Sequence, residues 1–110
     1  MLLKATARLS GIPELLAEVT RRESTANGSA GAGVLYVTVA PDERAAETVE
    51  ALRRTATRLG GSAVVLDAPP ELKTTLDTWG PVPAIDLMRR VKNEFDPTRV
   101  LAPGRFVGGL

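Results

Sequence analysis

The chain has 110 residues, 44% hydrophobic and 25% charged, which suits one globular domain. Its 14 basic and 13 acidic residues leave a net charge of +1, which gives no electrostatic case for a nucleic-acid or membrane partner. The absence of cysteine and histidine excludes disulfides and the commonest general base and metal ligand, so we expect no metal site.

The sequence contains no apolar run long enough to span a membrane. Its first residues, Met1–Lys4, turn polar too quickly for a secretory signal peptide. We therefore expect no membrane insertion and a cytoplasmic location, with which the absence of cysteine is consistent.

The first two elements are predicted by periodicity. Residues 3–9 alternate between apolar and polar, which predicts a strand with one buried face. Pro13 suits the first turn of a helix. The apolar residues of this helix follow at helical spacing: Ile12, Leu15, Leu16 and Val19.

The stretch 23–33 is less regular. Asn27-Gly28 is typical of a two-residue hairpin turn, whereas the glycine-rich sequence after it favours a longer loop. We predict a short strand at 23–26 and a firmer one at 34–40. The spacing Gly28-x-x-Gly31-x-Gly33 also invites a phosphate-loop interpretation, but such loops lead into a helix and this one leads into a predicted strand. We therefore predict a flexible loop.

The longest helix is predicted to start at Pro41-Asp42 and to end at Gly60-Gly61, where glycine suits the left-handed cap. Its other face is charged, and we predict that this face, including Arg53, is solvated. A short strand at 63–66 follows, and a helical turn or two at 71–77. The predicted buried seam of the long helix comprises Ala45, Val49, Leu52, Ala56 and Leu59.

This order of elements predicts an α+β fold. A split βαβ unit repeated once gives a ferredoxin-like antiparallel sheet with helices on one face, followed here by a C-terminal helix and an extended tail. We assign residues 1–78 to the ferredoxin-like core and residues 79–110 to the helix and tail, as parts of the same domain.

In the C-terminal quarter, apolar residues at helical spacing predict a helix that begins near Pro83 and stops at Asp96-Pro97. Burial of this stripe predicts that truncating Phe95 to Ala costs about 3–5 kcal/mol. After the helix, Pro103-Gly104 is typical of a turn and leaves Arg105 projecting. The stripe consists of Leu87, Met88, Val91 and Phe95.

This end of the chain resembles the C-terminal signature of FAD-linked oxidases of the vanillyl-alcohol-oxidase type, and most closely that of the FAD-binding subunit of glycolate oxidase. The signature departs from the family at Ala102, where the family usually has Asn before Pro-Gly. The residues that carry the resemblance are Lys92, Phe95, Asp96, Pro97, Leu101, Pro103, Gly104 and Arg105.

The resemblance implies a C-terminal cap fragment of an FAD-dependent oxidase or dehydrogenase. The parent would oxidise a 2-hydroxy acid such as glycolate by hydride transfer to the flavin. The implied partner is a flavin-binding domain or subunit, and Pro103, Gly104 and Arg105 are the implied cofactor-binding residues. The catalytic residues are not identified. Alone, the fragment is expected to bind no FAD, to catalyse nothing, to expose an apolar face and to form a homo-oligomer.

Two alternatives stay open at this point. One is a stand-alone ferredoxin-like module that binds a ligand or serves regulation or oligomerisation. The other is a scaffold subunit that joins a separate flavoprotein.

Overall fold

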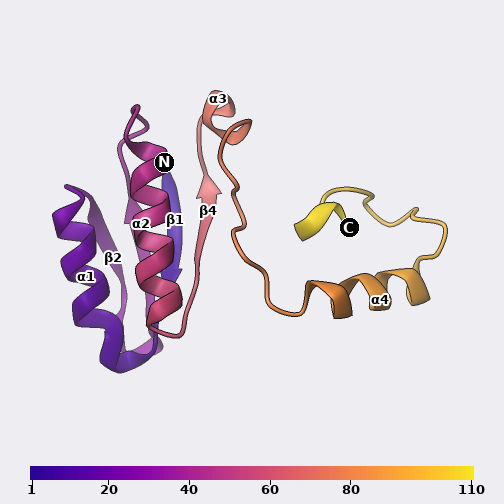
Figure 1. Cartoon of the computed structure of the whole chain (residues 1–110), viewed down its shortest axis with the longest axis horizontal. Coiled ribbons are helices and arrows are strands. Elements are labelled where there is room, and N and C mark those ends of the chain that lie inside the picture. The colour runs from indigo at the N-terminus through magenta and orange to yellow at the C-terminus, as the bar shows by residue number, and fades with distance from the viewer. The chain divides into compact units, whose positions relative to one another are not determined.

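The computed structural model describes all 110 residues, which divide into two compact units, Met1–Gly80 and Pro81–Leu110 (Figure 1). The strands, all in the first unit, are β1 (Leu2–Thr6), β2 (Thr25–Ser29), β3 (Val34–Thr38) and β4 (Ala63–Asp67). The helices are α1 (Ile12–Arg21), α2 (Ala45–Arg58) and α3 (Pro70–Lys73) in the first unit and α4 (Ile85–Phe95) in the second. None of them has the length and apolar character needed to cross a membrane.

The sheet has the strand order β2-β3-β1-β4, and every neighbouring pair is antiparallel. Together with the chain order β1-α1-β2-β3-α2-β4, this is the doubled split βαβ arrangement. Helices α1 and α2 lie against one face of the sheet (Figure 1). The predicted ferredoxin-like α+β fold is therefore confirmed.

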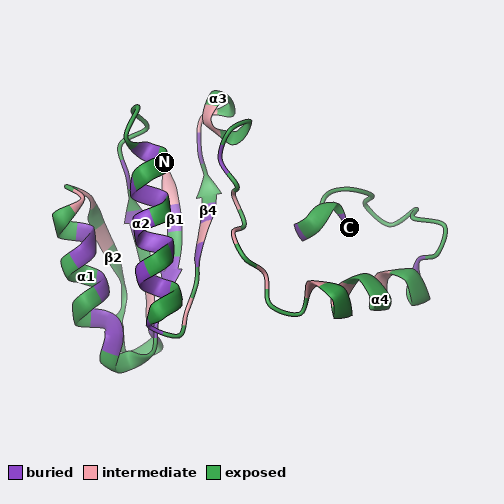
Figure 2. Cartoon of the chain, viewed as in Figure 1, coloured by how far each residue is buried: buried purple, intermediate pink, exposed green.

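The core of the first unit lies between the sheet and these two helices (Figure 2). The strands bury alternate residues, as a half-covered sheet requires: Leu35 and Val37 of β3 are buried, whereas Tyr36 between them is 39% exposed. All five residues of the predicted seam, from Ala45 to Leu59, are buried. The periodicities of the sequence thus predicted the faces that pack.

The hairpin turn that Asn27-Gly28 favoured does not form, and the short strand predicted at 23–26 lies instead at Thr25–Ser29. Asn27 and Gly28 lie inside β2 and pair with Tyr36 and Leu35 of β3. The chain reverses instead through a 3₁₀ turn and Gly33, whose φ of +66° is left-handed. A Cβ at Gly33 would lie 2.4 Å from the carbonyl oxygen of Ala7, so close packing also requires glycine there. The glycine-rich sequence leads into β3, so it has no helix N-terminus for a phosphate.

Two other predicted boundaries move. The first strand ends at Thr6. Leu9, predicted to lie on the buried face of this strand, lies instead in a 3₁₀ turn with 62% of its surface exposed. Helix α2 starts at Ala45 and not at Pro41, because residues 42–44 form a turn in which Asp42 Oδ1 accepts a hydrogen bond from the amide of Arg44.

Arg53 corrects the prediction of a solvated charged face on α2. Its residue surface is only 5% exposed, and its guanidinium donates to the carbonyl oxygens of Ala63 at 3.3 Å and Asp77 at 2.8 Å. A third group, the carboxylate of Glu50, pairs with it at 2.7 Å. Arg53 therefore ties β4 and the segment after α3 to α2, a role that helical periodicity alone does not reveal.

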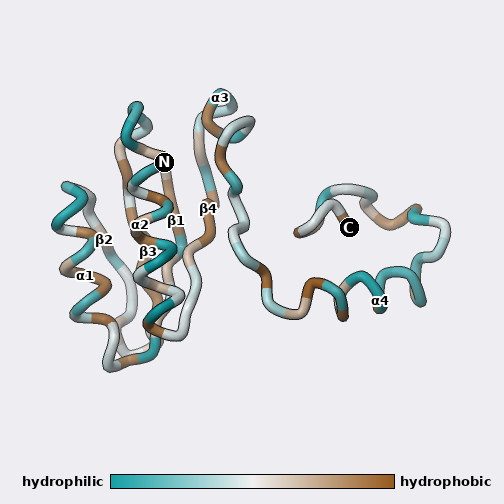
Figure 3. The backbone as a smooth tube through the Cα atoms, viewed as in Figure 1, coloured by the Kyte–Doolittle hydropathy of each residue, from teal (hydrophilic) through white to brown (hydrophobic).

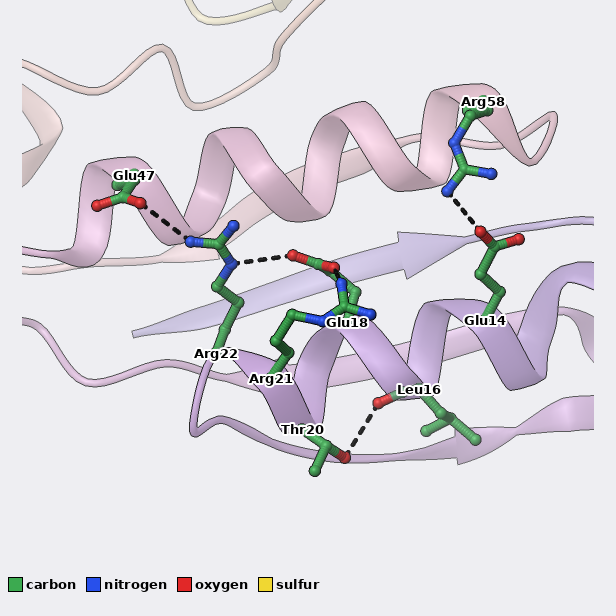
Figure 4. Close-up of polar contacts among 8 residues, drawn as sticks. All are labelled: Glu14, Leu16, Glu18, Thr20, Arg21, Arg22, Glu47 and Arg58. Atoms are coloured by element: carbon green, nitrogen blue, oxygen red, sulfur yellow. Dashed lines mark hydrogen bonds and ion pairs between the residues drawn. The ribbon is translucent and has the colours of Figure 1, made fainter.

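Ion pairs also join α1 and α2 along their polar sides (Figure 4). Arg58 pairs with Glu14 at 2.7 Å, and this hydrogen bond lowers the pKa of the Glu14 carboxyl. Arg22 pairs with Glu47 at 3.0 Å and with the buried Glu18 at 2.9 Å, and these carboxylates raise the pKa of the Arg22 guanidinium. The pairs with exposed carboxylates, Arg58–Glu14 and Arg22–Glu47, add at most about 1 kcal/mol each, so the apolar core supplies most of the stability.

Candidate functional site

The candidate site lies in the second unit, and α4 supplies one wall of it. The helix ends at Phe95, just before Asp96-Pro97, as predicted. Its start differs, because Ala84 has a left-handed φ of +61° that leaves Pro83 outside the helix. Helix α4 therefore begins at Ile85.

The apolar stripe of α4 is not buried, which corrects the prediction for Phe95. Phe95 is 81% exposed, Leu87 52% and Val91 49%, and no residue of α4 is buried (Figure 2). The helical pattern correctly marks an apolar face, but the unit of residues 81–110 buries only Asp96, Val107 and Leu110. In this chain, truncation of Phe95 therefore removes little buried surface.

This exposed stripe forms a hollow of about 600 Å³ together with the tail. Brown, hydrophobic segments recur along α4 and along the tail that follows it (Figure 3). The apolar lining comprises Leu87, Met88, Val91 and Phe95 of the helix and Leu101, Ala102, Phe106 and Leu110 of the tail. Three charged residues complete it: Lys92, Asp96 and Arg105. The expected exposed apolar face is thus present in the second unit.

Asp96 is the most buried residue of this lining, at 4% exposure. Its carboxylate accepts hydrogen bonds from the amides of Val100 at 2.9 Å and Leu101 at 3.1 Å, and pairs with Lys92 Nζ at 2.5 Å. Lys92 Nζ also donates to the carbonyl oxygen of Leu101 at 2.7 Å. The hydrogen bond from Lys92 lowers the pKa of the Asp96 carboxyl, and the two amides lower it further, against the opposing effect of burial.

The three residues predicted to bind the cofactor, Pro103, Gly104 and Arg105, follow the coil segment whose Val100 and Leu101 amides donate to Asp96. Pro103 and Gly104 form the predicted turn, with Gly104 at a φ of +73°, and the amide of Arg105 donates to the carbonyl oxygen of Ala102 at 3.2 Å. The Arg105 side chain is exposed, lines the hollow and takes part in none of the ion pairs of the chain. That these residues contact a cofactor stays a prediction.

In the sequence, Lys92 and Asp96 stand out only as members of the C-terminal motif. A lysine four residues before an aspartate that ends a helix was the available signal, because side chains at that spacing meet on a helix. The two backbone amides that converge on Asp96 belong to a coil, and no periodicity predicts where they point.

A family model described as "FAD linked oxidases, C-terminal domain" matches residues 6–106, which include strands β2, β3 and β4, all four helices and the motif near the C-terminus. No curated protein and no solved structure matches the chain.

Proposed function

Because the chain belongs to the family of C-terminal domains of FAD linked oxidases, we propose that it is the cap part of an FAD-dependent oxidoreductase of the vanillyl-alcohol-oxidase type. The family implies a flavoprotein and a flavin-binding partner domain. The observation that carries the proposal is the family match, since it covers 6–106 and hence both units. The exposed hollow of the second unit supports it independently, because a large apolar surface marks a site of interaction.

We propose that this hollow docks on the flavin-binding domain or subunit. Phe95, Leu101 and Phe106 are 81%, 63% and 56% exposed, and a stable interface buries such side chains at its centre. Without that partner, the same surface is available to a second copy of the chain, so the isolated chain is expected to form a homo-oligomer. Sedimentation over a range of concentrations tests this, and a strict monomer at high concentration would count against it.

The residues of this chain fit one part of FAD and not another. The hollow offers an apolar wall and one guanidinium without an ion-pair partner, a combination that suits a flat ring with an electron-rich edge. The glycine-rich segment that ends at Gly33 leads into a strand, so it provides no helix N-terminus for the diphosphate. We therefore propose that the partner holds FAD and that Pro103, Gly104 and Arg105 approach it from the cap side.

The proposed substrate is a 2-hydroxy acid such as glycolate, as for the FAD-binding subunit of glycolate oxidase that the tail resembles. When bound, FAD would supply the redox chemistry, as the acceptor of the hydride from the carbon that bears the hydroxyl group, and loss of the hydroxyl proton would complete a 2-oxo acid. The cap excludes water from the substrate, and the Arg105 guanidinium stabilises negative charge that develops beside it. Ala102 lacks the side-chain amide usual in that family, so any hydrogen bond from this position is absent.

The assignment of 1–78 and 79–110 to one domain stays a prediction, as does the lack of activity of the chain alone. FAD titration into the isolated chain tests the second point. Tight, stoichiometric binding would refute the proposal that a partner holds the cofactor.

The decisive experiment uses the FAD-loaded assembly of this chain with its flavin-binding domain or subunit. Arg105→Gln is expected to lower the reduction potential of the bound FAD by about 30 mV or more. The reason is that the variant loses a positive charge that stabilises the reduced flavin by about 1.4 kcal/mol. Arg105→Lys retains the charge and serves as the matched control. An unchanged potential in Arg105→Gln would place Arg105 away from the flavin.

A further inference from the structure

The buried carboxylate of Asp96 is unusual in its surroundings. It is 4% exposed in a unit whose apolar side chains are largely open to solvent, and a carboxylate is withdrawn from water only where other groups replace the water. Three donors do so here: the amides of Val100 and Leu101 and the ammonium group of Lys92. These three interactions therefore fix the amides of Val100 and Leu101 and the ammonium group of Lys92 around the Asp96 carboxylate.

The two backbone amides that donate to Asp96 belong to the coil after α4 and not to the helix. Asp96 directly follows α4, and its two amide partners lie four and five residues further on. Lys92, one helical turn earlier, reaches both the carboxylate and the carbonyl oxygen of Leu101. Both the N–H and the C=O of Leu101 are thus fixed to the end of α4.

This anchored residue is the base of the turn that carries Arg105. Ala102 follows Leu101 directly, and its carbonyl oxygen accepts the amide hydrogen of Arg105, which closes the turn over Pro103 and Gly104. A short closed turn on a fixed base leaves its last side chain few orientations. If Leu101 were released, the turn would pivot as a whole and Arg105 would move with it.

We propose that Lys92 and Asp96 are positioning residues, which act through the backbone of Leu101 to set the orientation of Arg105 against the FAD held by the partner. The proposal rests on the proposed function of Arg105. Neither residue needs to touch the cofactor, and each is specific in its chemistry: the carboxylate accepts from two amides, and the ammonium group donates to two oxygens.

The first test examines the anchoring in the full 110-residue chain without any cofactor. Asp96→Asn and Lys92→Met are each expected to lower the protection of the Val100 or Leu101 amide against hydrogen exchange by about tenfold or more, since bonds to charged groups are lost. Lys92→Arg, which can still donate to two oxygens, should restore it. Glu94→Gln and Arg90→Met remove the same charges from exposed positions of α4 and should leave protection unchanged.

The second test examines positioning in the FAD-loaded assembly. Asp96→Asn is expected to lower the reduction potential of the bound FAD in the same direction as Arg105→Gln. The double variant Asp96→Asn/Arg105→Gln should lower the reduction potential no further than Arg105→Gln alone, because both changes act through one guanidinium. Lys92→Met provides the same comparison should Asp96→Asn fail to assemble with its partner.

The outcomes separate the two proposals. If Arg105→Gln leaves the potential unchanged, the proposed function of Arg105 fails, and with it the positioning role. If Arg105→Gln lowers the potential but neither Asp96→Asn nor Lys92→Met does, the proposed function stands and the positioning role is overturned. Unchanged amide protection in both variants, or a fully additive double variant, would also overturn it.

Discussion

Helices α2 and α4 have the same kind of sequence and opposite surroundings. Each has an apolar stripe at helical spacing and an opposite face of charged residues. In α2 the stripe is closed over by the sheet, and Leu52 and Val49 have no exposed surface. In α4 the stripe remains open, and Phe95 is 81% exposed.

The difference shows what an amphipathic pattern predicts. It identifies the face of a helix that must be covered, but it does not say whether the cover comes from the same chain. The first unit supplies a sheet and a second helix to cover α2, whereas the residues after α4 supply only a coil and a short 3₁₀ turn at Val107–Gly109. The open stripe of α4 is therefore best explained by a partner, as the family match also implies.

The largest expected effect comes from deleting side chains on the two stripes. Leu52→Ala should lower the free energy of unfolding by about 2–5 kcal/mol, because it leaves a cavity in the core. Phe95→Ala, the matched change on α4, should cost below about 1 kcal/mol in the isolated chain, because little buried surface is lost. Denaturant unfolding at low protein concentration measures both. Similar costs would mean that the α4 stripe is buried in solution.

A smaller loss is expected from Arg53, the buried cation of α2. Arg53→Met keeps most of the apolar stem but removes the donors to the carbonyl oxygens of Ala63 and Asp77, at a cost of about 1–3 kcal/mol. Arg54→Met is the control, since Arg54 is exposed and should change stability by no more than about 0.5 kcal/mol. Equal effects on thermal unfolding would refute the inferred role of Arg53.

As the pH falls, the hydrogen bonds of Asp96 in the second unit are expected to break before the apolar core of the first unit unfolds. The pKa of Asp96 is lowered from its ordinary value of 3.8, so its stabilisation is complete above that pH and is lost as the pH falls through the lowered pKa. Amide chemical shifts of Val100 and Leu101 report the transition. Asp96→Asn should lack it, and a midpoint at or above 3.8 in the unaltered chain would contradict the prediction.

The smallest effect concerns the backbone of the tail. Ala102 has a φ of +45°, a left-handed conformation that costs a residue with a Cβ about 1–2 kcal/mol, whereas glycine loses about 0.5–1 kcal/mol in entropy. Ala102→Gly should thus stabilise the turn by about 0.5 kcal/mol, measured as slower hydrogen exchange of the Arg105 amide. Ala102→Asn should act in the same direction, since Asn tolerates this conformation. Faster exchange in both variants would contradict the assigned backbone strain.

Much of the fold was predictable, because local periodicity determines which face of an element packs. The alternation in β3 and the seam of α2 both marked residues that are now buried, and the order of elements predicted the sheet. Arg53 was mispredicted because its partners come from residues 63 and 77, which no local pattern connects to it. Asn27-Gly28 was mispredicted because pairing with β3 outweighed the local turn preference.

Local patterns of residues were enough to predict most of the elements, their apolar faces, the end of α4 at Asp96-Pro97 and the resemblance to the family. These follow from interactions between residues close in sequence, or from a pattern of residue types. The folded chain was needed to show that the α2 stripe is covered, that the α4 stripe is open, and that the Val100 and Leu101 amides both donate to Asp96. Burial and hydrogen bonding depend on what the rest of the chain brings to a surface, and no local pattern contains that information.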